Sequence, residues 1–356
     1  MSGEKEGIVI EYLMGKIRSG AWKIGSRIPS EYTLAEKFSI DKATANRAVS
    51  TLVTRGYLKR TRGAGGTILL HQSIFPKWRF VYTGVLPFVH SFYARLTMGL
   101  MESAYSSENS MMLLPLRGIR DFETFEDRIK MLNPDLLFIG GEVPPFLLPD
   151  IPVIAMDSYC IRERGKNVYL LNPDNYEAGR MVIDEVYAKG HRNIAHCCDP
   201  SSIEVEKLRL QGASDRAKKL GIDLILLNKR TLPENPLAFR RYLPNLLKRV
   251  SVIICENDIY AASFIGLCRR CGIRIPEDVS ICSYVLCPEF HHFYKISSVD
   301  FSPYELGEYA MSLALRLLNG EKIRSHEELF PVTFFDGETL VGCKIRGTES
   351  QSAHGK

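Results

Sequence analysis

Two hydrophobic patterns divide this chain of 356 residues near position 80. Before that point, apolar residues recur at every third or fourth position, which predicts short amphipathic helices. Beyond it, apolar runs such as residues 135–140 and 251–255 alternate with amphipathic stretches such as residues 176–189 and 260–271. Strands that are apolar throughout and alternate with helices predict parallel sheets covered on both faces. We therefore expect an α/β chain in which a small helical module precedes a large domain.

The small module carries the signals of three helices. The apolar face of residues 7–20 predicts the first helix, and we expect Gly20 to end it. Ser30 and Asp41 each precede an amphipathic stretch, and their side-chain oxygens can accept hydrogen bonds from the free N–H groups of a helix start. The third helix is expected to bury four residues at helical spacing, which are Ala45, Ala48, Val49 and Leu52.

A basic hairpin follows the third helix. Residues 57–60 and 67–70 have the pattern of two short strands, joined by the glycine-rich turn of residues 63–66. Helix, turn, helix and hairpin in this order predict a winged helix-turn-helix module. The first 71 residues carry 12 Lys and Arg against 6 Asp and Glu, whereas the rest of the chain carries 34 against 35. The excess positive charge thus lies where DNA phosphates would be bound.

Residues 8–70 resemble the N-terminal DNA-binding domain of the GntR family, through the motifs SGAWKIGSRIPSE, LAEKFSID and LVTRGYLKR. The resemblance implies a two-fold dimer on operator DNA, with the helix after Asp41 in the major groove and the wing in the minor groove. Family members usually carry arginine where Tyr32 and Asn46 stand, and often where Lys42 stands, so the operator sequence stays open. The candidate DNA contacts are Ser30, Tyr32, Lys42, Thr44, Asn46, Arg47, Arg62, Gly63, Ala64 and Gly65.

The large domain, residues 80–343, resembles the effector domain of the LacI family. The matching motifs include PDLLFIGG, IPVIAMD, NPDNYEAGRMVIDEVYAKGHRNIAHC and ENDIYAASFIGLCRRCGIRIPEDVSICSY. The resemblance implies two lobes with two parallel sheets, like periplasmic sugar-binding proteins, and a small-molecule ligand, most simply a sugar, in the cleft between them. A GntR-type reader joined to a LacI-type sensor is similar to the arabinose-repressor type of regulator.

Six residues are candidates for holding the ligand, because sugar hydroxyls need paired donors and acceptors and the apolar sugar face packs on aromatic rings. The motifs of the resemblance supply Asp157, Arg209, Asn257 and Phe301, and the loop after the first strand supplies Phe92 and Tyr93. Asn257 is equally suited to cap the helix that begins beside it. In place of an aspartate that usually binds sugar in the family stands Val285, which accepts no hydrogen bond from its side chain. The ligand is then less polar at that edge, or another residue compensates, or the ligand has been lost.

Other classes of function find little support. No phosphate-binding glycine loop or nucleophile motif follows a strand, so we expect no enzyme and no cofactor. Cys268 and Cys271 form a single C-x-x-C without a second pair, which favours buried thiols over a metal site. No apolar run is long enough to span a membrane, and the stretch MSGEKEG has no signal-peptide pattern, so we expect a cytoplasmic protein.

We therefore expect a homodimeric transcription regulator, most simply a repressor, controlled by a sugar or sugar derivative. The expected organisation is a DNA-binding domain at residues 1–71, a linker at 72–79, a two-lobed domain at 80–343 and a flexible tail at 344–356. One alternative is a regulator whose sensor binds a protein partner or has lost its ligand. A DNA-linked enzyme is the more distant alternative, since no catalytic constellation is present.

Overall fold

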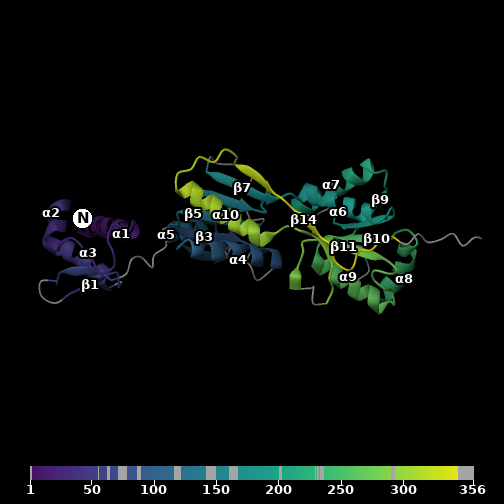
Figure 1. Cartoon of the computed structure of the whole chain (residues 1–356), viewed down its shortest axis with the longest axis horizontal. Coiled ribbons are helices and arrows are strands. Elements are labelled where there is room, and N and C mark those ends of the chain that lie inside the picture. Colours follow the sequence, from purple (N-terminus) through teal and green to yellow (C-terminus); the bar gives the residue numbers. More distant parts are fainter. Residues whose placement is uncertain are drawn as a thin grey trace, which may run out of the picture. The chain divides into compact units, whose positions relative to one another are not determined.

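The fold is that of a computed structural model, which describes residues 2–54, 56–61, 65–70, 78–85, 90–115, 122–141, 150–159, 167–199, 203–228, 230, 232, 236–289 and 293–343. It consists of two compact units, one of Met1–Phe80 with Ala104–Met112 and one of Val81–Ser103 with Leu113–Lys356. The α/β class with an N-terminal winged module is confirmed (Figure 1). Most of the expected linker and the whole expected tail lie outside the described residues.

The N-terminal module packs three helices and a hairpin around one apolar core. The helices are α1 (Ser2–Arg18), α2 (Glu31–Phe38) and α3 (Lys42–Thr54), and β1 (Leu58–Arg60) pairs antiparallel with β2 (Thr67–Leu69). The first helix thus begins and ends earlier than the expected residues 7–20. The four residues expected to be buried on α3 are all fully buried, together with Leu13, Leu34 and Leu69 from the surrounding elements.

The larger unit contains two six-stranded sheets, each of which forms one lobe. The first lobe has the strand order β13-β7-β6-β5-β3-β4 and the second has β14-β12-β11-β10-β8-β9. The first-lobe strands are β3 (Arg79–Gly84), β4 (Ser110–Pro115), β5 (Leu136–Gly140), β6 (Val153–Met156), β7 (Val168–Pro173) and β13 (Glu327–Phe330). The second-lobe strands are β8 (Ile194–Cys198), β9 (Leu224–Asn228), β10 (Val252–Cys255), β11 (Ser280–Tyr284), β12 (Ser297–Asp300) and β14 (Thr333–Phe335).

The chain passes between the lobes three times, after β7, after β12 and between β13 and β14. The helices α4 (Ser91–Ser106), α5 (Phe122–Leu132) and α10 (Pro303–Leu318) belong to the first lobe. The second lobe holds α6 (Asn175–Ala188), α7 (Glu204–Lys219), α8 (Pro236–Leu247) and α9 (Asp258–Arg270). The strand β14 runs antiparallel to β12, whereas β8 to β12 run parallel to their neighbours. Ligands of such sheets bind beyond the carboxyl ends of the strands.

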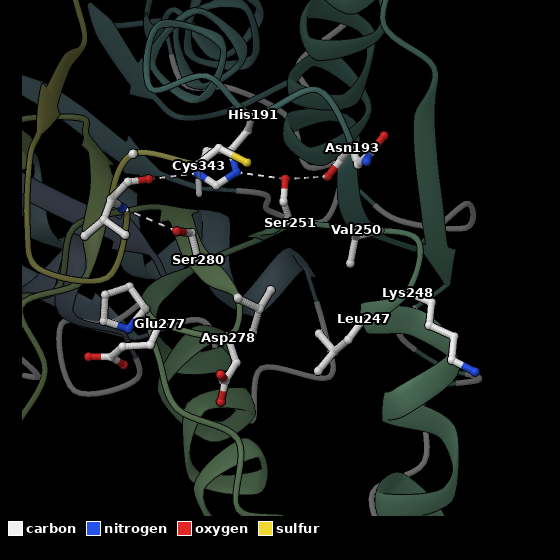
Figure 2. A pocket seen from close by; sticks show the side chains of 14 residues that line it. His191, Asn193, Leu247, Lys248, Val250, Ser251, Glu277, Asp278, Ser280 and Cys343 are labelled. Atoms are coloured by element: carbon white, nitrogen blue, oxygen red, sulfur yellow. Dashed lines mark hydrogen bonds between the residues drawn. The ribbon is translucent and has the colours of Figure 1, made fainter. Parts of the chain in front are cut away.

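A cavity of about 450 Å³ opens at the opposite, amino-terminal end of the second sheet (Figure 2). His191 spans one wall of it, with Nδ1 2.8 Å from Ser251 Oγ and Nε2 2.9 Å from the carbonyl oxygen of Val341. Ser280 Oγ accepts a hydrogen bond from the backbone N–H of Val341. Because these polar groups are already paired within the protein, they brace the base of the lobe.

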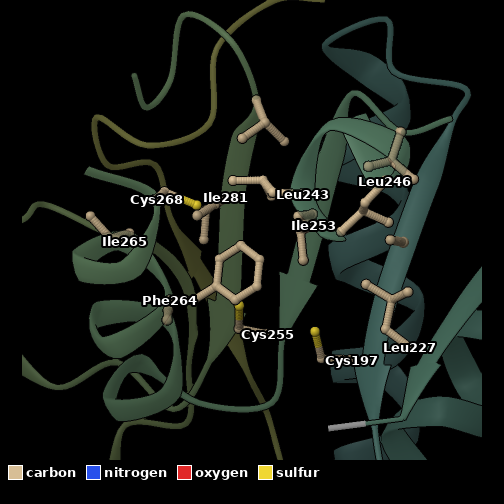
Figure 3. Close-up of a cluster of buried hydrophobic side chains, with 14 of the residues drawn as sticks. Cys197, Leu227, Leu243, Leu246, Ile253, Cys255, Phe264, Ile265, Cys268 and Ile281 are labelled. Atoms are coloured by element: carbon tan, nitrogen blue, oxygen red, sulfur yellow. The ribbon is translucent and has the colours of Figure 1, made fainter. Parts of the chain in front are cut away.

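The core of the second lobe lies between its sheet and the helices α8 and α9 (Figure 3). Phe264 packs edge-on against Phe239, with ring centres 5.2 Å apart. Cys197 and Cys255, on the neighbouring strands β8 and β10, and Cys268 on α9 are fully buried here as free thiols. Cys268 of the C-x-x-C motif is therefore a core residue, and among the described residues no group of three His, Cys, Asp or Glu could hold a metal ion.

No helix in the described part of the chain is long and apolar enough to cross a bilayer.

Candidate DNA-binding surface and inter-lobe site

Both predicted helix caps of the DNA-binding module are present. Ser30 Oγ accepts from the backbone N–H of Thr33 at 3.1 Å, and Asp41 Oδ1 accepts from that of Thr44 at 2.8 Å. The Thr44 hydroxyl donates to Asp41 Oδ2 at 2.7 Å, and these bonds lower the pKa of Asp41. Thr44 is only 2 % exposed. Its hydroxyl therefore completes the cap of α3, and its contact with DNA stays a prediction.

Several of the predicted DNA contacts are exposed on α2 and α3. Tyr32 is 71 % exposed in the first turn of α2, and Lys42 and Asn46 are exposed along α3. Arg47 is turned toward α1, where its Nε lies 3.6 Å from Glu6 Oε2, and its Nη2 donates to Thr44 Oγ1 at 2.7 Å. Arg47 is therefore partly neutralised, whereas Tyr32, Lys42 and Asn46 are exposed, as a DNA contact would require.

Arg60, at the end of β1, was not among the predicted contacts, and it joins the wing to the reading helix. Its Nη2 donates to Asn46 Oδ1, to Ser50 Oγ at 3.1 Å and to Glu31 Oε1 at 3.4 Å. An asparagine that reads adenine must accept with Oδ1 while it donates with Nδ2. In the structure, Asn46 Oδ1 already accepts from Arg60, so reading of adenine by Asn46 would involve this contact. In the sequence, the basic residues of the first hairpin strand could have pointed to Arg60.

The wing turn is described only at its end. Arg62, Gly63 and Ala64 lie outside the described residues. A Cβ on Gly65 would lie 2.1 Å from Thr61 Oγ1, and Gly66 has φ of +69°. The glycines are therefore required by the tight turn, whatever their part in DNA contact.

The inter-lobe site, defined here as Tyr93, Asp157, Tyr159, Asn175, Arg209 and Phe301, gathers four of the six predicted ligand residues. Arg209 lies on α7, in the second lobe. Its Nε donates to Asn175 Oδ1 at 2.7 Å, and its Nη1 lies 3.5 Å from the carbonyl oxygen of Glu256. Its Cζ lies 4.7 Å from the centre of the buried Phe301 ring. One edge and one face of the guanidinium are thus fixed by the protein.

The first lobe contributes an acidic group to the same site. The Tyr93 hydroxyl donates to Asp157 Oδ2 at 2.7 Å, and burial raises the pKa of Tyr93 well above its usual value, so this hydroxyl remains a donor. Burial also raises the pKa of Tyr159, whose hydroxyl accepts from Asn175 Nδ2 at 2.7 Å. The chain Arg209–Asn175–Tyr159 therefore connects the second lobe to the first through hydrogen bonds.

The two remaining predicted residues have partners within the protein. Asn257 caps α9, since its Oδ1 accepts from the backbone N–H of Tyr260 at 2.8 Å. Capping this helix is the alternative role that the sequence allowed for Asn257. Phe92 is 6 % exposed and packs edge-on against Tyr93, with ring centres 5.1 Å apart. Phe92 therefore packs against Tyr93, and its contact with a ligand stays a prediction.

Sequence reasoning missed a buried polar layer beneath Arg209. Tyr284 lies under the guanidinium, with its ring centre 5.5 Å from Arg209 Cζ, and its hydroxyl is 3.0 Å from His196 Nε2. Burial lowers the pKa of His196 to about 4, so the ring is neutral at neutral pH. His90 precedes α4; burial lowers its pKa first, and the positive charge of Arg209 lowers it further. Tyr284 and His196 stand within the matching motifs, but no spacing in the sequence places them beneath Arg209.

Val285 occupies a tight bend after β11. It is buried, and its φ is +59°, a conformation that is rare for a β-branched residue. Beside it, Asp258 accepts hydrogen bonds from the Ser283 and Ser298 hydroxyls and, at 2.9 Å, from the backbone N–H of Cys287. The Ser91 hydroxyl of the first lobe reaches Cys287 Sγ at 3.1 Å. The carboxylate of Asp258 therefore holds the bend at Cys287, the residue that Ser91 of the first lobe contacts.

Two family models match the chain. Residues 7–68 match the model described as "Bacterial regulatory proteins, gntR family", and residues 183–340 match "Periplasmic binding protein-like domain". The first model covers the winged module, and the second covers most of the second lobe with part of the first.

Curated proteins and solved structures agree with the family models. The HTH-type transcriptional repressor CytR of Escherichia coli K12 is 25% identical over 326 residues, which cover 87% of this chain and 88% of that protein. Catabolite control protein A of Staphylococcus aureus is 23% identical over 255 residues, covering 67% and 75%.

The larger unit has the fold of LacI-type regulators. A ribose operon repressor protein from Lactobacillus acidophilus superposes with a TM-score of 0.61 and 21% identity, covering 76% of this chain and 99% of that one. A LacI-type regulator from Alkaliphilus metalliredigens complexed with D-xylulofuranose gives 0.61 and 20%, covering 74% and 99%. These relatives are described as regulators and not as enzymes, in agreement with the sequence. The chain is therefore a DNA-binding transcription regulator that fuses a gntR-family winged helix-turn-helix domain to a LacI-like, periplasmic-binding-protein-like domain.

Proposed function

We propose that this regulator is a repressor whose operator affinity is set by a carbohydrate bound at the inter-lobe site. The observation that carries the proposal is Arg209, which is fixed by Asn175 and Phe301 in the second lobe and is connected to Tyr159 of the first lobe through Asn175. A ligand that touches Arg209 and Asp157 at once binds both lobes. It therefore favours the lobe arrangement in which both contacts can be made.

The repressor assignment and the carbohydrate class come from relatives. CytR is named a transcriptional repressor, and the Lactobacillus protein is named a ribose operon repressor. The Alkaliphilus regulator holds D-xylulofuranose. The aromatic and hydrogen-bonding groups of Phe301, Asn175 and Asp157 suit the same kind of ligand.

We propose a homodimer that acts in the cytoplasm, where operator DNA is found. Three large apolar side chains on α4, Met98, Met101 and Tyr105, are exposed by 52 %, 46 % and 84 %. Their spacing of three and four residues places them on one face of the helix. An apolar stripe of this kind supports association with a second copy of the chain, which would bring two winged modules to the two halves of an operator.

The proposed domain boundaries are those expected from the sequence. We propose residues 1–71 as the DNA-binding domain, 72–79 as the linker and 80–343 as the effector domain. Binding at the inter-lobe site would then change operator affinity through the lobe arrangement, which is an energetic coupling between two sites.

The test begins by selecting an operator from random duplexes with the full chain. Affinity for that operator is then measured by fluorescence anisotropy with and without each member of a carbohydrate panel. A carbohydrate that changes the affinity supports the proposal. A chain that binds its operator equally with every carbohydrate, while a protein from the same cells changes the affinity, would favour the alternative of a protein-binding sensor.

A further inference from the structure

The charge of Arg209 meets no carboxylate from the part of the chain that the structure describes. Among the described residues, none places a carboxylate within 4 Å of its guanidinium, whose bonds go to the neutral amide of Asn175 and the neutral carbonyl of Glu256. The ring of Phe301 covers one face. A half-buried cation without an anionic partner is costly when further water is removed.

The nearby carboxylates have other partners. Asp157 accepts the Tyr93 hydroxyl, and Glu256 Oε1 accepts from Asn257 Nδ2 at 3.3 Å. Asp258 lies buried behind the bend and accepts from two serine hydroxyls and a backbone N–H. Val285, at that bend, supplies no charge.

The geometry of Arg209 leaves its outer edge for a ligand. Asn175 occupies Nε, and Nη1 has only the 3.5 Å contact to Glu256. Among the described residues, no side chain or backbone group bonds Nη2. The terminal edge of a guanidinium presents two parallel N–H groups, which match the two oxygens of a carboxylate or phosphate.

From these observations we propose that the ligand carries an anionic group, a carboxylate or a phosphate, which Arg209 holds with its Nη1 and Nη2 edge. The ligand is thus an acidic carbohydrate, with its hydroxyls directed toward Asp157 in the first lobe. This inference rests on the proposed function and adds the charge of the ligand. The anion supplies the counterion that the protein does not, so binding and lobe closure remove the uncompensated charge together.

The test is a thermal-shift and calorimetry series in which each sugar is offered in matched forms. Glucose, gluconate, glucuronate and glucose 6-phosphate form one set, and ribose, ribonate and ribose 5-phosphate form another, with acetate and inorganic phosphate as bare anions. The expected result is binding of an acidic form at least 100-fold tighter than its neutral parent. Tighter binding of the sugar acid than of the sugar phosphate would identify the anion as a carboxylate, and the reverse order would identify it as a phosphate.

Two variants separate the charge from the shape of the site. Arg209→Gln should reduce the preference for the acidic form to less than about 10-fold, whereas Arg269→Gln, on α9, should leave it unchanged. A neutral sugar that binds best and alters operator affinity would overturn this inference while the proposed function stood. Absence of binding by every compound would overturn both, and binding of acetate or phosphate alone, as tightly as the sugar forms, would overturn the carbohydrate part.

Discussion

Gly179 on α6 faces the backbone carbonyl of Arg209 on α7 so closely that a Cβ built on the glycine would lie 2.0 Å from that oxygen. Gly212 of α7 is packed in the same way against Tyr176 of α6, where a Cβ would lie 2.0 Å from the carbonyl oxygen. The absence of side chains at these two positions lets the helices approach and fixes where Arg209 stands.

Replacing Gly179 with alanine should therefore move α7 and disturb Arg209. We expect Gly179→Ala to destabilise the protein by about 1–3 kcal/mol, the usual cost of overpacking, and to weaken ligand binding. Gly266 on α9 is the matched control, because a Cβ there meets nothing within 4 Å. Gly266→Ala should raise stability by about 0.5–1 kcal/mol through helix propensity. Urea unfolding of both variants checks this, and equal effects would disprove the packing argument.

His196 should make the protein less stable in acid. Its pKa is about 4 in the folded chain because of burial, against about 6.5 when unfolded. Between these values the unfolded state binds the extra proton, so stability is lost as pH falls from 6.5 to 4. The loss approaches about 3 kcal/mol, from 1.36 kcal/mol per pKa unit.

The measurement is urea unfolding at several pH values with His196→Gln as the comparison. Burial raises the pKa of Asp258 to about 6, which works in the opposite direction over the same range. The informative quantity is thus the difference in the free energy of unfolding between the wild-type protein and His196→Gln. It should shrink from pH 7 to pH 4.5, and a constant difference would show that His196 does not titrate in this way.

The dimer prediction concerns the exposed stripe on α4. Tyr105→Asp should place a charge on the most exposed residue of the stripe and give a monomer by light scattering with size-exclusion chromatography. Leu237 on α8 is 73 % exposed and serves as the control. Leu237→Asp should leave the dimer intact. If Tyr105→Asp also remains dimeric, the α4 stripe is not the contact.

The contact between Arg60 and Asn46 predicts that the wing strand affects base reading. Arg60→Ala should weaken operator binding by roughly 10-fold and change the selected base at one position of each half-site, since a base pair read by an amide is worth about 1–3 kcal/mol. Lys59→Ala removes the same charge from the neighbouring position on β1 and should weaken binding without changing the base. In-vitro selection with both variants checks this; the same selected sequence for Arg60→Ala and wild type would contradict a role in reading.

The sequence predicted the architecture well because its signals were local. The caps Ser30 and Asp41, the helix face of α3 and apolar runs such as residues 135–140 and 251–255 each depend on neighbouring residues, and each is present. The strands β12, β13 and β14 were not predicted, because β13 and β14 are short, largely exposed and close the sheets only through contacts far along the chain. The helices α5 and α10 were also left out.

The inter-lobe site was predicted in part for the same reason. Arg209, Asp157 and Phe301 stand in motifs and Tyr93 follows the first strand, so the resemblance could place them. Asn175, Tyr159 and Tyr284 come together only when separate strands converge, and no spacing in the sequence reveals that. Asn257 and Thr44 illustrate the converse, since a polar residue at a helix start is as useful for capping as for binding.

The central claim is that the inter-lobe site controls operator binding, and Arg209→Ala tests it most directly. With the carbohydrate that acts on the wild-type protein, operator affinity is measured by fluorescence anisotropy for both proteins across a ligand titration. The account predicts equal affinities without ligand and a response in the wild type only, since losing the charged contact should weaken ligand binding by about 2–5 kcal/mol. An Arg209→Ala protein that responds to the same ligand at the same concentration would contradict it.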